Sequence, residues 1–388
     1  MLSRRSFLVL SAASVTVAGL SRFPAASAAP SAFTLRLTDN SGSGGSFAYV
    51  TGTSADNRLV LLRSDGSPYY PSSPSSPQTP LPVDCAIPLP NQITVPRMSA
   101  ARLYVVTGGA RLDFYLNPGP ALVHPSFLNT SDTNYGKDFS FAEFTFNDAG
   151  LYANISYVDL VGPPIGLDLT AASVPEQSVA GLPAGSVDGI AADLAAVGGP
   201  WGGLVQKRSD GRNLRVIAAH HKAGDFAGYL DGYIDAVWQR YSGTTLTVDS
   251  QNPGLGSFTG RVSGGVLTFD NGESFGKPVT ADVLSCDTGP FAIPQGSSAA
   301  RIAIVPRLAA AFNRTTLLDN PVQPTAEDPA KFYRNSVTNH YARVVHARLP
   351  GNRGYAFPYD DVTPGPDFSG AVYAQDPQVL TVTVSATR

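Results

Sequence analysis

Short β-type runs separated by turn-forming residues constrain the fold of this chain most strongly. Between about residues 33 and 162 the runs alternate with clusters of Gly, Pro, Ser and Asn; examples are SFAYVTGT, RLVLLRS, ARLYVVTG, RLDFYLN, FAEFTFN and LYANISYVDL. Such spacing is typical of antiparallel sheets that form a sandwich or barrel. The stretch 68–82 carries too many prolines for a central strand and predicts an extended surface loop. The region therefore predicts a mainly β domain.

After about residue 166 the apolar spacing becomes helical. Residues 186–197 combine a Ser cap with an early acid, and 225–241 place apolar residues on one helical face: Phe226, Tyr229, Leu230, Tyr233, Ala236 and Val237. Residues 297–313 and 328–349 are also expected to be helical, with Pro306 breaking or kinking the first. Strands are expected between these helices, in the runs TTLTVDS, SFTGRVS and GVLTFDN.

The last strand-like run, QVLTVTVSAT, returns to strict alternation, and we expect it to pair with the first domain. The predicted organisation is therefore a discontinuous β domain, 29–165 with 350–388, into which an α/β domain, 166–349, is inserted. A cleft between two such domains is the usual place for a binding site.

Residues 1–28 have the pattern of a cleaved secretory signal peptide: a charged start, an apolar stretch and the small residues Ala26-Ser27-Ala28. Residues 3–8, SRRSFL, resemble a twin-arginine export signal. The alternative is a membrane anchor, but the apolar run from Phe7 to Leu20 is too short to span a bilayer and contains serine and threonine. We expect export to the extracellular space, with no membrane association after cleavage.

Charge narrows the possible partners. The formal net charge is −3, and cleavage after Ala28 removes three arginines and no acid, which leaves −6. A mildly acidic chain without a basic run argues against nucleic acid or an anionic membrane as a partner. Hydrophobic residues make up 43% of the chain, which is too many for a disordered protein.

Neither the cysteines nor the histidines predict a cofactor. Cys85 and Cys286 are the only thiols, and the sequence leaves open whether they form a disulfide. His220 and His221 are adjacent, so on a strand they would point to opposite faces. The spacing of the other histidines suggests no metal ligand set, and we expect no metal.

The most informative stretch is FAEFTFNDAGLYANISYVDL (141–160), which contains Glu143 and Asp159. On a strand Glu143, Thr145 and Asn147 share one face, and the intervening phenylalanines form the other. We expect 141–147 and roughly 153–160 to be paired antiparallel strands with both acids facing one cleft. A loop with an odd number of residues, centred near Leu151, would set them opposite each other, whereas a tighter turn would leave them further apart.

Two readings of this acidic pair stay open on residue pattern alone. The acids either solubilise an exposed sheet face or act as the acid and base of a hydrolase. Gly272–Gly276 also matches G-x-S-x-G, but the strand before it is followed by Lys277-Pro278 and a β-like run. A nucleophile elbow needs a helix there, so a turn is the better interpretation than a serine nucleophile at Ser274.

Several blocks of the sequence resemble known proteins. AEFTFN followed by NISYVDLVGPPIGL resembles strands of the thaumatin-like proteins, and ARLYVVTG resembles their G-R-I-W-A-R-T segment. The closer resemblance, extending through SCDTGPF (285–291) and GYAFPYDDV (354–362), is to laminaripentaose-producing β-1,3-glucanases of glycoside hydrolase family 64. The plant thaumatin-like proteins are rich in cysteine and have Asp and Arg where this chain has Asn154 and Val106, which favours the bacterial glucanases.

The resemblance implies an inverting, endo-acting hydrolase of β-1,3-glucan, such as laminarin, curdlan or fungal wall glucan. It implies a thaumatin-like β-barrel or sandwich and an α/β domain that form a crescent with a wide groove. Glu143 would be the general acid, Asp159 the general base, and Thr145, Asn147 and Tyr152 would bind substrate. Neither a metal nor an organic cofactor is implied, and we expect a monomer.

Several other residues have two interpretations, one in which they line the groove and one in which they have only a structural role. Trp201, Tyr355 and Tyr359 either stack on sugar rings or pack inside the fold, and Asp287 and Asp360-Asp361 either line the groove or lie on solvated loops. A non-catalytic β-glucan-binding protein is the competing function, because a fold alone does not establish activity.

Overall fold

The protein is described here from a computed structural model, which covers residues 29–365 and 367–387. The predicted signal peptide lies outside these residues. None of the helices in the described ranges combines the length and apolar character needed to cross a membrane.

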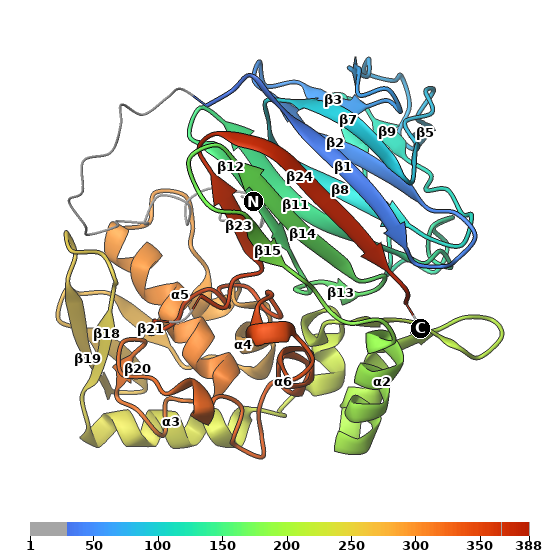
Figure 1. Cartoon of the computed structure of the whole chain (residues 1–388). Coiled ribbons are helices and arrows are strands. Elements are labelled where there is room, and N and C mark those ends of the chain that lie inside the picture. Colours follow the sequence, from blue (N-terminus) through green and yellow to red (C-terminus); the bar gives the residue numbers. More distant parts are fainter. Residues whose placement is uncertain (1–28, 366, 388) are drawn as a thin grey trace.

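Two sheets pack face to face in the upper part of Figure 1 and form a sandwich. The five-stranded sheet has the order β15 (Gln177–Val179), β14 (Ile165–Ala171), β24 (Pro377–Ser385), β1 (Ala32–Asn40), β7 (Asn91–Pro96). The eight-stranded sheet has the order β23 (Ala371–Ala374), β12 (Gly150–Ile155), β11 (Phe139–Asn147), β8 (Met98–Val106), β2 (Phe47–Ser54), β3 (Leu59–Leu62), β4 (Pro68–Tyr69), with β6 (Ile87–Pro88) beside β2.

Alternation along the strands builds the core between these sheets. Phe144 and Phe146 on β11 point inward and meet Phe33 of β1 edge to face, with ring centroids 6.0 and 5.1 Å apart. All three rings are buried, and edge-to-face aromatic pairs add to the stabilisation from burial. The opposite face of β11 is therefore left for polar residues.

The C-terminal strand is the central strand of the five-stranded sheet, and it pairs with β1 of the predicted β domain, as expected from the sequence. β24 pairs in parallel with β1 from Thr34↔Val379 to Asn40↔Ser385, so the two ends of the described chain share one sheet. The red strand beside the blue one in Figure 1 shows this pairing. The mainly β character that the sequence predicted is confirmed, and so is the presence of helices.

The remaining strands form three further sheets. A three-stranded sheet contains β10 (Ala121–Val123), β9 (Tyr115–Asn117), β5 (Thr79–Pro80); another contains β13 (Leu160–Val161), β17 (Asn213–Ile217), β16 (Val205–Lys207). A five-stranded sheet has the order β21 (Ser274–Gly276), β20 (Val266–Phe269), β19 (Ser257–Ser263), β18 (Leu246–Asp249), β22 (Val322–Gln323). The strands expected in TTLTVDS, SFTGRVS and GVLTFDN are thus confirmed.

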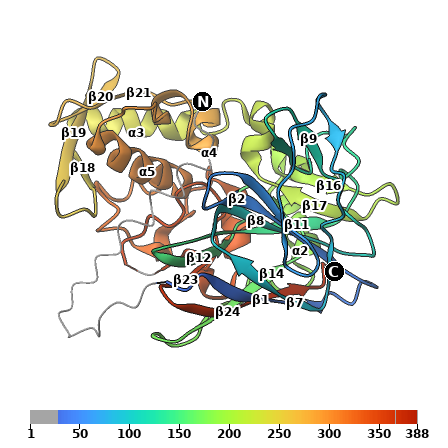
Figure 2. The same cartoon turned by 90° about the horizontal axis from the view of Figure 1, so that it is seen from above.

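Helices cover the lower part of the molecule in Figure 1. The α-helices are α2 (Ser186–Val197), α3 (Asp231–Gly243), α4 (Thr280–Ser285), α5 (Ala299–Arg314) and α6 (His340–His346). The 3₁₀ helices are η2 (Gly199–Leu204), η3 (Ala219–Phe226), η4 (Gly289–Phe291), η5 (Pro329–Lys331) and η6 (Pro350–Asn352). A second hydrophobic core lies between α3, α5 and the sheet β18–β21, and Figure 2 shows this unit beside the sandwich from above.

Two helix predictions need correction. The helix expected over 225–241 is α3, which begins only at Asp231, because Gly228 adopts the left-handed region (φ 76°) and the residues before it form η3. Of its expected apolar face, Ala236 is exposed, whereas Ile234 and Trp238 are buried. The buried face of α3 is therefore rotated about the helix axis relative to the predicted one.

The helix expected over 328–349 shrinks to the seven residues of α6. Tyr333 has a left-handed backbone (φ 59°), and the Asn339 side chain caps α6 by accepting from the Ala342 N–H. These features keep the α-helix from starting before residue 340, and the earlier part of the predicted range contains only the short 3₁₀ helix η5. Of the two outcomes expected at Pro306, a break or a kink, the break does not occur, since α5 runs through this residue.

Candidate active site

The hairpin β11–β12 supplies the first acid. Its turn is only Asp148-Ala149, because Asn147 pairs with Gly150 and the Asn147 Oδ1 accepts from the Ala149 N–H at 2.8 Å. Gly150 has φ 118°, and a Cβ there would lie 2.3 Å from the Ala374 carbonyl oxygen, so glycine is required. The tighter turn is thus the one that forms.

This register corrects the predicted parity of the second strand. Glu143 pairs with Asn154 and Thr145 with Tyr152, so odd-numbered residues of β11 face the same side as even-numbered residues of β12. β12 ends at Ile155, and the strand expected to continue to residue 160 does not form. Asp159 is therefore not on β12 at all.

Asp159 reaches the same side because the chain leaves the sheet. After Ile155, the Tyr157 N–H donates to the Tyr355 carbonyl, and Leu160 then pairs with Ile217 of β17 in another sheet. The backbone carbonyl of Asp159 accepts from the Ala218 N–H at 2.9 Å. These contacts hold Asp159 between the sandwich and the segment β17–η3.

Arg102 connects the two acids. It lies on β8 directly beside Glu143 in register, and its Nε donates to Glu143 Oε1 at 2.9 Å. Its Nη2 lies 3.9 Å from Asp159 Oδ2. The three side chains are 17–21% exposed, so solvent still reaches the cluster. The structure therefore brings both predicted acids to one guanidinium.

The position of Arg102 is itself well determined. Its guanidinium carbon lies 4.2 Å from the centre of the Phe141 ring, two residues before Glu143 on the same face of β11. The Tyr104 hydroxyl lies 3.5 Å from Nη1 and 2.7 Å from His124 Nδ1. Stacking on an aromatic ring restricts the guanidinium and favours its charged form.

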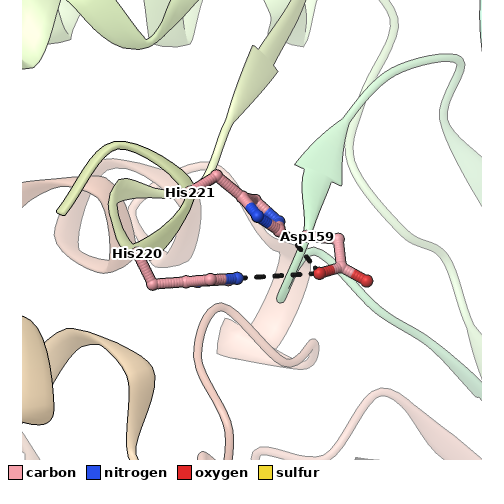
Figure 3. Close-up of side chains that lie close together, drawn as sticks. All are labelled: Asp159, His220 and His221. Atoms are coloured by element: carbon pink, nitrogen blue, oxygen red, sulfur yellow. Dashed lines mark hydrogen bonds and ion pairs between the residues drawn. The ribbon is translucent and has the colours of Figure 1, made fainter. Parts of the chain in front are cut away.

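Two histidines contact Asp159 from the other side (Figure 3). His221 Nε2 lies 3.0 Å and His220 Nε2 3.7 Å from Asp159 Oδ1. Both histidines belong to η3, not to a strand, so their rings converge where the sequence predicted that they would diverge. Their centroids lie 3.9 Å apart.

The partners of Asp159 favour its ionised form. Burial by itself would raise its pKa, but the hydrogen bonds from His220 and His221, the charge of His221 and that of Arg102 together hold the pKa of Asp159 well below its usual range. An ionised carboxylate is the form that a general base requires. Asp159, His220 and His221 are also a group able to offer three metal ligands, with the ligand atoms all within 4.8 Å of one another.

The three predicted substrate residues lie on this face of the sheet. Thr145 and Tyr152 are paired across β11 and β12 and are half-buried, whereas Asn147 is exposed at the turn. Tyr152 and Tyr355 share a hydrogen bond between their hydroxyls at 3.1 Å, and burial raises the pKa of Tyr152 to about 12. Tyr373, on β23 in register with Tyr152, is 49% exposed and was not indicated by the sequence.

The other residues that the sequence offered as groove residues differ in their exposure. Trp201 and Tyr355 are buried, at 1% and 5% exposure. Asp360 is also buried and binds His346 Nε2 at 2.6 Å and Arg314 Nη2 at 3.0 Å, so it is structural. Tyr359, Asp287 and Asp361 are half-buried.

The motif around Ser274 and the two thiols are settled as well. Ser274 begins β21, which pairs with β20 in a hairpin. A nucleophile elbow needs a helix that starts directly after the serine, but here the strand continues to Gly276 and α4 starts only at Thr280. Cys85 and Cys286 are both buried and do not form a disulfide.

Arg102, His220 and His221 are the site residues that the sequence did not indicate. Arg102 lies in the ARLYVVTG strand. The alternation of side chains predicts which face of the sheet Arg102 occupies, but it does not predict which residue of β11 lies beside it. The histidines are far from Asp159 in sequence, and they meet it through the β13–β17 pairing. A pair of adjacent histidines at the end of a strand was the only available signal.

This chain is similar to known proteins in sequence and in fold. The profile of the β-1,3-glucanase family Glyco_hydro_64 matches residues 31–384. The chain is 32% identical to a glucan endo-1,3-β-glucosidase of Arthrobacter sp. (strain YCWD3), over 93% of this chain and 67% of that protein.

Two crystal structures are similar in fold. One is a laminaripentaose-producing β-1,3-glucanase in complex with laminaritetraose, with a TM-score of 0.83 and 33% identity over 92% of this chain and 100% of that chain. The other is a family 64 β-1,3-glucanase domain from Clostridium beijerinckii, with a TM-score of 0.73 and 25% identity over 92% of this chain and 98% of that chain.

Proposed function

The chain belongs to the β-1,3-glucanases of glycoside hydrolase family 64, and from this premise we propose that it is an inverting, endo-acting hydrolase of β-1,3-glucan. Glu143 is the general acid and Asp159 the general base. The products are short laminari-oligosaccharides, with the pentasaccharide favoured, as the name of the similar laminaripentaose-producing enzyme suggests.

The observation that carries this proposal is the shared contact of both acids with Arg102. One guanidinium binds Glu143 at 2.9 Å and lies 3.9 Å from Asp159. Since Nε and Nη2 of a planar guanidinium are about 2.3 Å apart, Oε1 of Glu143 and Oδ2 of Asp159 are at most about 9 Å apart. Inverting glycosidases separate their carboxyl groups by roughly 6.5–9.5 Å, which leaves room for a water. The upper limit of about 9 Å on the distance between Glu143 Oε1 and Asp159 Oδ2 is compatible with this range.

The chemistry assigns one proton transfer to each acid. Protonated Glu143 gives its proton to the glycosidic oxygen while the bond from that oxygen to C1 breaks. Ionised Asp159 takes a proton from a water whose oxygen bonds to C1 on the opposite face. Glu143 ends the turnover ionised and Asp159 protonated, and exchange with solvent restores both.

The substrate residues follow from the face that Glu143 occupies. Thr145 and Asn147 offer short hydrogen-bonding groups for sugar hydroxyls, and Tyr152 offers a ring edge and a hydroxyl beside them. The proposed substrate site is a wide groove between a thaumatin-like β domain, 29–165 with 350–388, and an α/β domain, 166–349. A groove open at both ends would permit endo-cleavage of laminarin, curdlan or fungal wall glucan.

The setting proposed for this activity is extracellular. Residues 1–28 carry the twin-arginine-type signal pattern, and an insoluble wall polysaccharide can be reached only outside the cell. The enzyme would work there as a monomer, with neither a membrane contact nor a cofactor.

Removal of each acid in turn tests the proposal. Glu143→Gln cannot protonate the leaving oxygen and Asp159→Asn cannot activate water, so each should lower kcat on curdlan by at least about 100-fold with oligosaccharide binding retained. NMR of the fresh product should show the α-anomer. Early release of the β-anomer would mean retention with Asp159 as the nucleophile, and wild-type rates in both variants would place the active site elsewhere.

A further inference from the structure

His220 and His221 have no part in the two proton transfers, yet both are directed at Asp159. We propose that they are positioning residues for the general base: they hold Asp159 Oδ1 so that Oδ2 alone meets the attacking water. The inference rests on the proposed function, in which Asp159 is the base. Of the two histidines, His221 has the larger part in this positioning, because its Nε2 lies nearer to Asp159 Oδ1, at 3.0 Å.

The main chain ties the histidines to the base they contact. The Asp159 carbonyl accepts from the Ala218 N–H at 2.9 Å, and the His221 N–H donates to the Ala218 carbonyl at 3.1 Å. Backbone and side chain of Asp159 are thus both bound by the short segment 218–221. Phe127 packs edge-on against the His221 ring, with centroids 5.1 Å apart, and restricts its rotation.

The two oxygens of Asp159 have different surroundings. Oδ1 faces the two imidazoles, and Oδ2 faces Arg102 Nη2 at 3.9 Å, beyond hydrogen-bond length. A water between Asp159 and the substrate would therefore contact Oδ2, the oxygen that faces Arg102 and its other partner Glu143. If the histidines released Oδ1, the carboxylate could rotate and present either oxygen, and fewer encounters would have the geometry for attack.

The same three side chains could instead be read as a metal site, but the charge around them disfavours that reading. Arg102 is a fixed cation beside Asp159, and a divalent ion bound by Oδ1 would lie close to it. A metal on the base would also compete with its task of accepting a proton. A positioning role agrees with both features.

The charged and titratable groups near Asp159 determine how the pH dependence of activity changes when one of its partners is removed. Arg102 lies beside Asp159 on the sandwich side and also binds Glu143, and His220 and His221 contact Asp159 from η3. Tyr341 of α6, whose hydroxyl donates to the Tyr157 carbonyl at 2.6 Å, is close enough for the charge of Asp159 to raise its pKa. The His221 hydrogen bond stabilises the ionised form, so its removal moves the acidic limb of the activity profile to higher pH.

His221→Leu and His221→Gln form the decisive pair of variants. Leu removes the donor, whereas the amide of Gln restores an N–H near the Nε2 position. We expect kcat of His221→Leu to fall about 10- to 100-fold, the range for loss of a hydrogen bond to a charged group. KM should stay nearly unchanged and the acidic limb should shift upward. His221→Gln should recover most of kcat, and His220→Leu should lose less.

Controls keep the test separate from folding and from the function itself. Asp225→Asn, an exposed position in the same η3 segment, should behave as wild type, and melting temperature and laminari-oligosaccharide binding should show that His221→Leu is folded. If Asp159→Asn is inactive but His221→Leu keeps wild-type kcat and pH profile, the positioning role is wrong and the base stands. If Asp159→Asn is active, the proposed function fails first.

Zinc binding tests the alternative that Asp159, His220 and His221 form a metal site. If calorimetry shows one Zn²⁺ bound to wild type but not to His221→Leu, and EDTA abolishes activity that Zn²⁺ restores, the cluster is a metal centre and the positioning role is overturned. We expect instead that EDTA leaves activity unchanged.

Discussion

Replacing Arg102 with Met would remove the cation that both acids share and keep most of the volume of the side chain. At 2.9 Å from Glu143 and 3.9 Å from Asp159, the two attractions are each worth about 4–6 kcal/mol before desolvation at an effective dielectric constant of 20. Desolvation offsets much of this, and breaking a buried pair typically costs about 3–5 kcal/mol. Because the groups are about one-fifth exposed, we expect the free energy of unfolding to fall by about 2–3 kcal/mol.

The pH dependence of this loss has a defined sign. The folded pKa of Asp159 lies below its ordinary value of 3.8, so its contribution to stability is present above that value and is lost as the pH falls through the folded pKa. Arg102→Met removes part of that contribution. The difference in unfolding free energy between wild type and Arg102→Met should therefore be largest near neutral pH and should shrink in acid.

A double-mutant cycle isolates the ion pair. Urea unfolding of wild type, Arg102→Met, Glu143→Gln and the double variant at pH 7 gives the coupling energy, and we expect about 1–2 kcal/mol for this partly buried pair. Arg36→Met, at an exposed position of β1, is the control and should change stability little. A coupling below about 0.3 kcal/mol, the error of such cycles, would show that the contact does not organise the acids.

Three further predictions concern other positions. Thr145→Ala should lower kcat/KM on laminarin with an unchanged melting temperature, whereas Asn147→Ala should also cost about 1 kcal/mol of unfolding free energy, because the turn loses its hydrogen bond to the Ala149 N–H. Normal kinetics in both would show that neither contacts sugar. Asp360→Asn should lower the unfolding free energy by about 3–5 kcal/mol, because buried Arg314 loses its nearer carboxylate and is left with Glu327 Oε2 at 3.8 Å. Since the pKa of Asp360 is lowered, the loss should be full above about pH 4 and shrink in acid. An unchanged urea midpoint at pH 7 would refute it.

Local pattern predicted the elements that depend on neighbours in sequence. Helix α2 spans Ser186–Val197 as the apolar spacing predicted, and β19 spans the predicted run 257–263. The predicted Ser cap is wrong, because the N-cap is Gly185 and the Ser186 hydroxyl donates to the Pro183 carbonyl instead. Prediction was wrong where a single backbone conformation interrupted a favourable pattern. Gly228 delayed α3, and the left-handed Tyr333 removed most of the helix expected over 328–349.

The sequence by itself determined the chemistry available at the candidate site. The alternation of β11 fixed that Glu143 and Thr145 share a polar face over a phenylalanine core, because side chains on a strand alternate whatever the strand pairs with. The tertiary structure alone decided which groups meet the acids. Asp159 reaches the site after leaving the sheet, Arg102 arrives through the β8–β11 register and His221 through the β13–β17 pairing. Those contacts depend on register and on where a strand ends, which are set by long-range packing and not by any residue's neighbours in sequence.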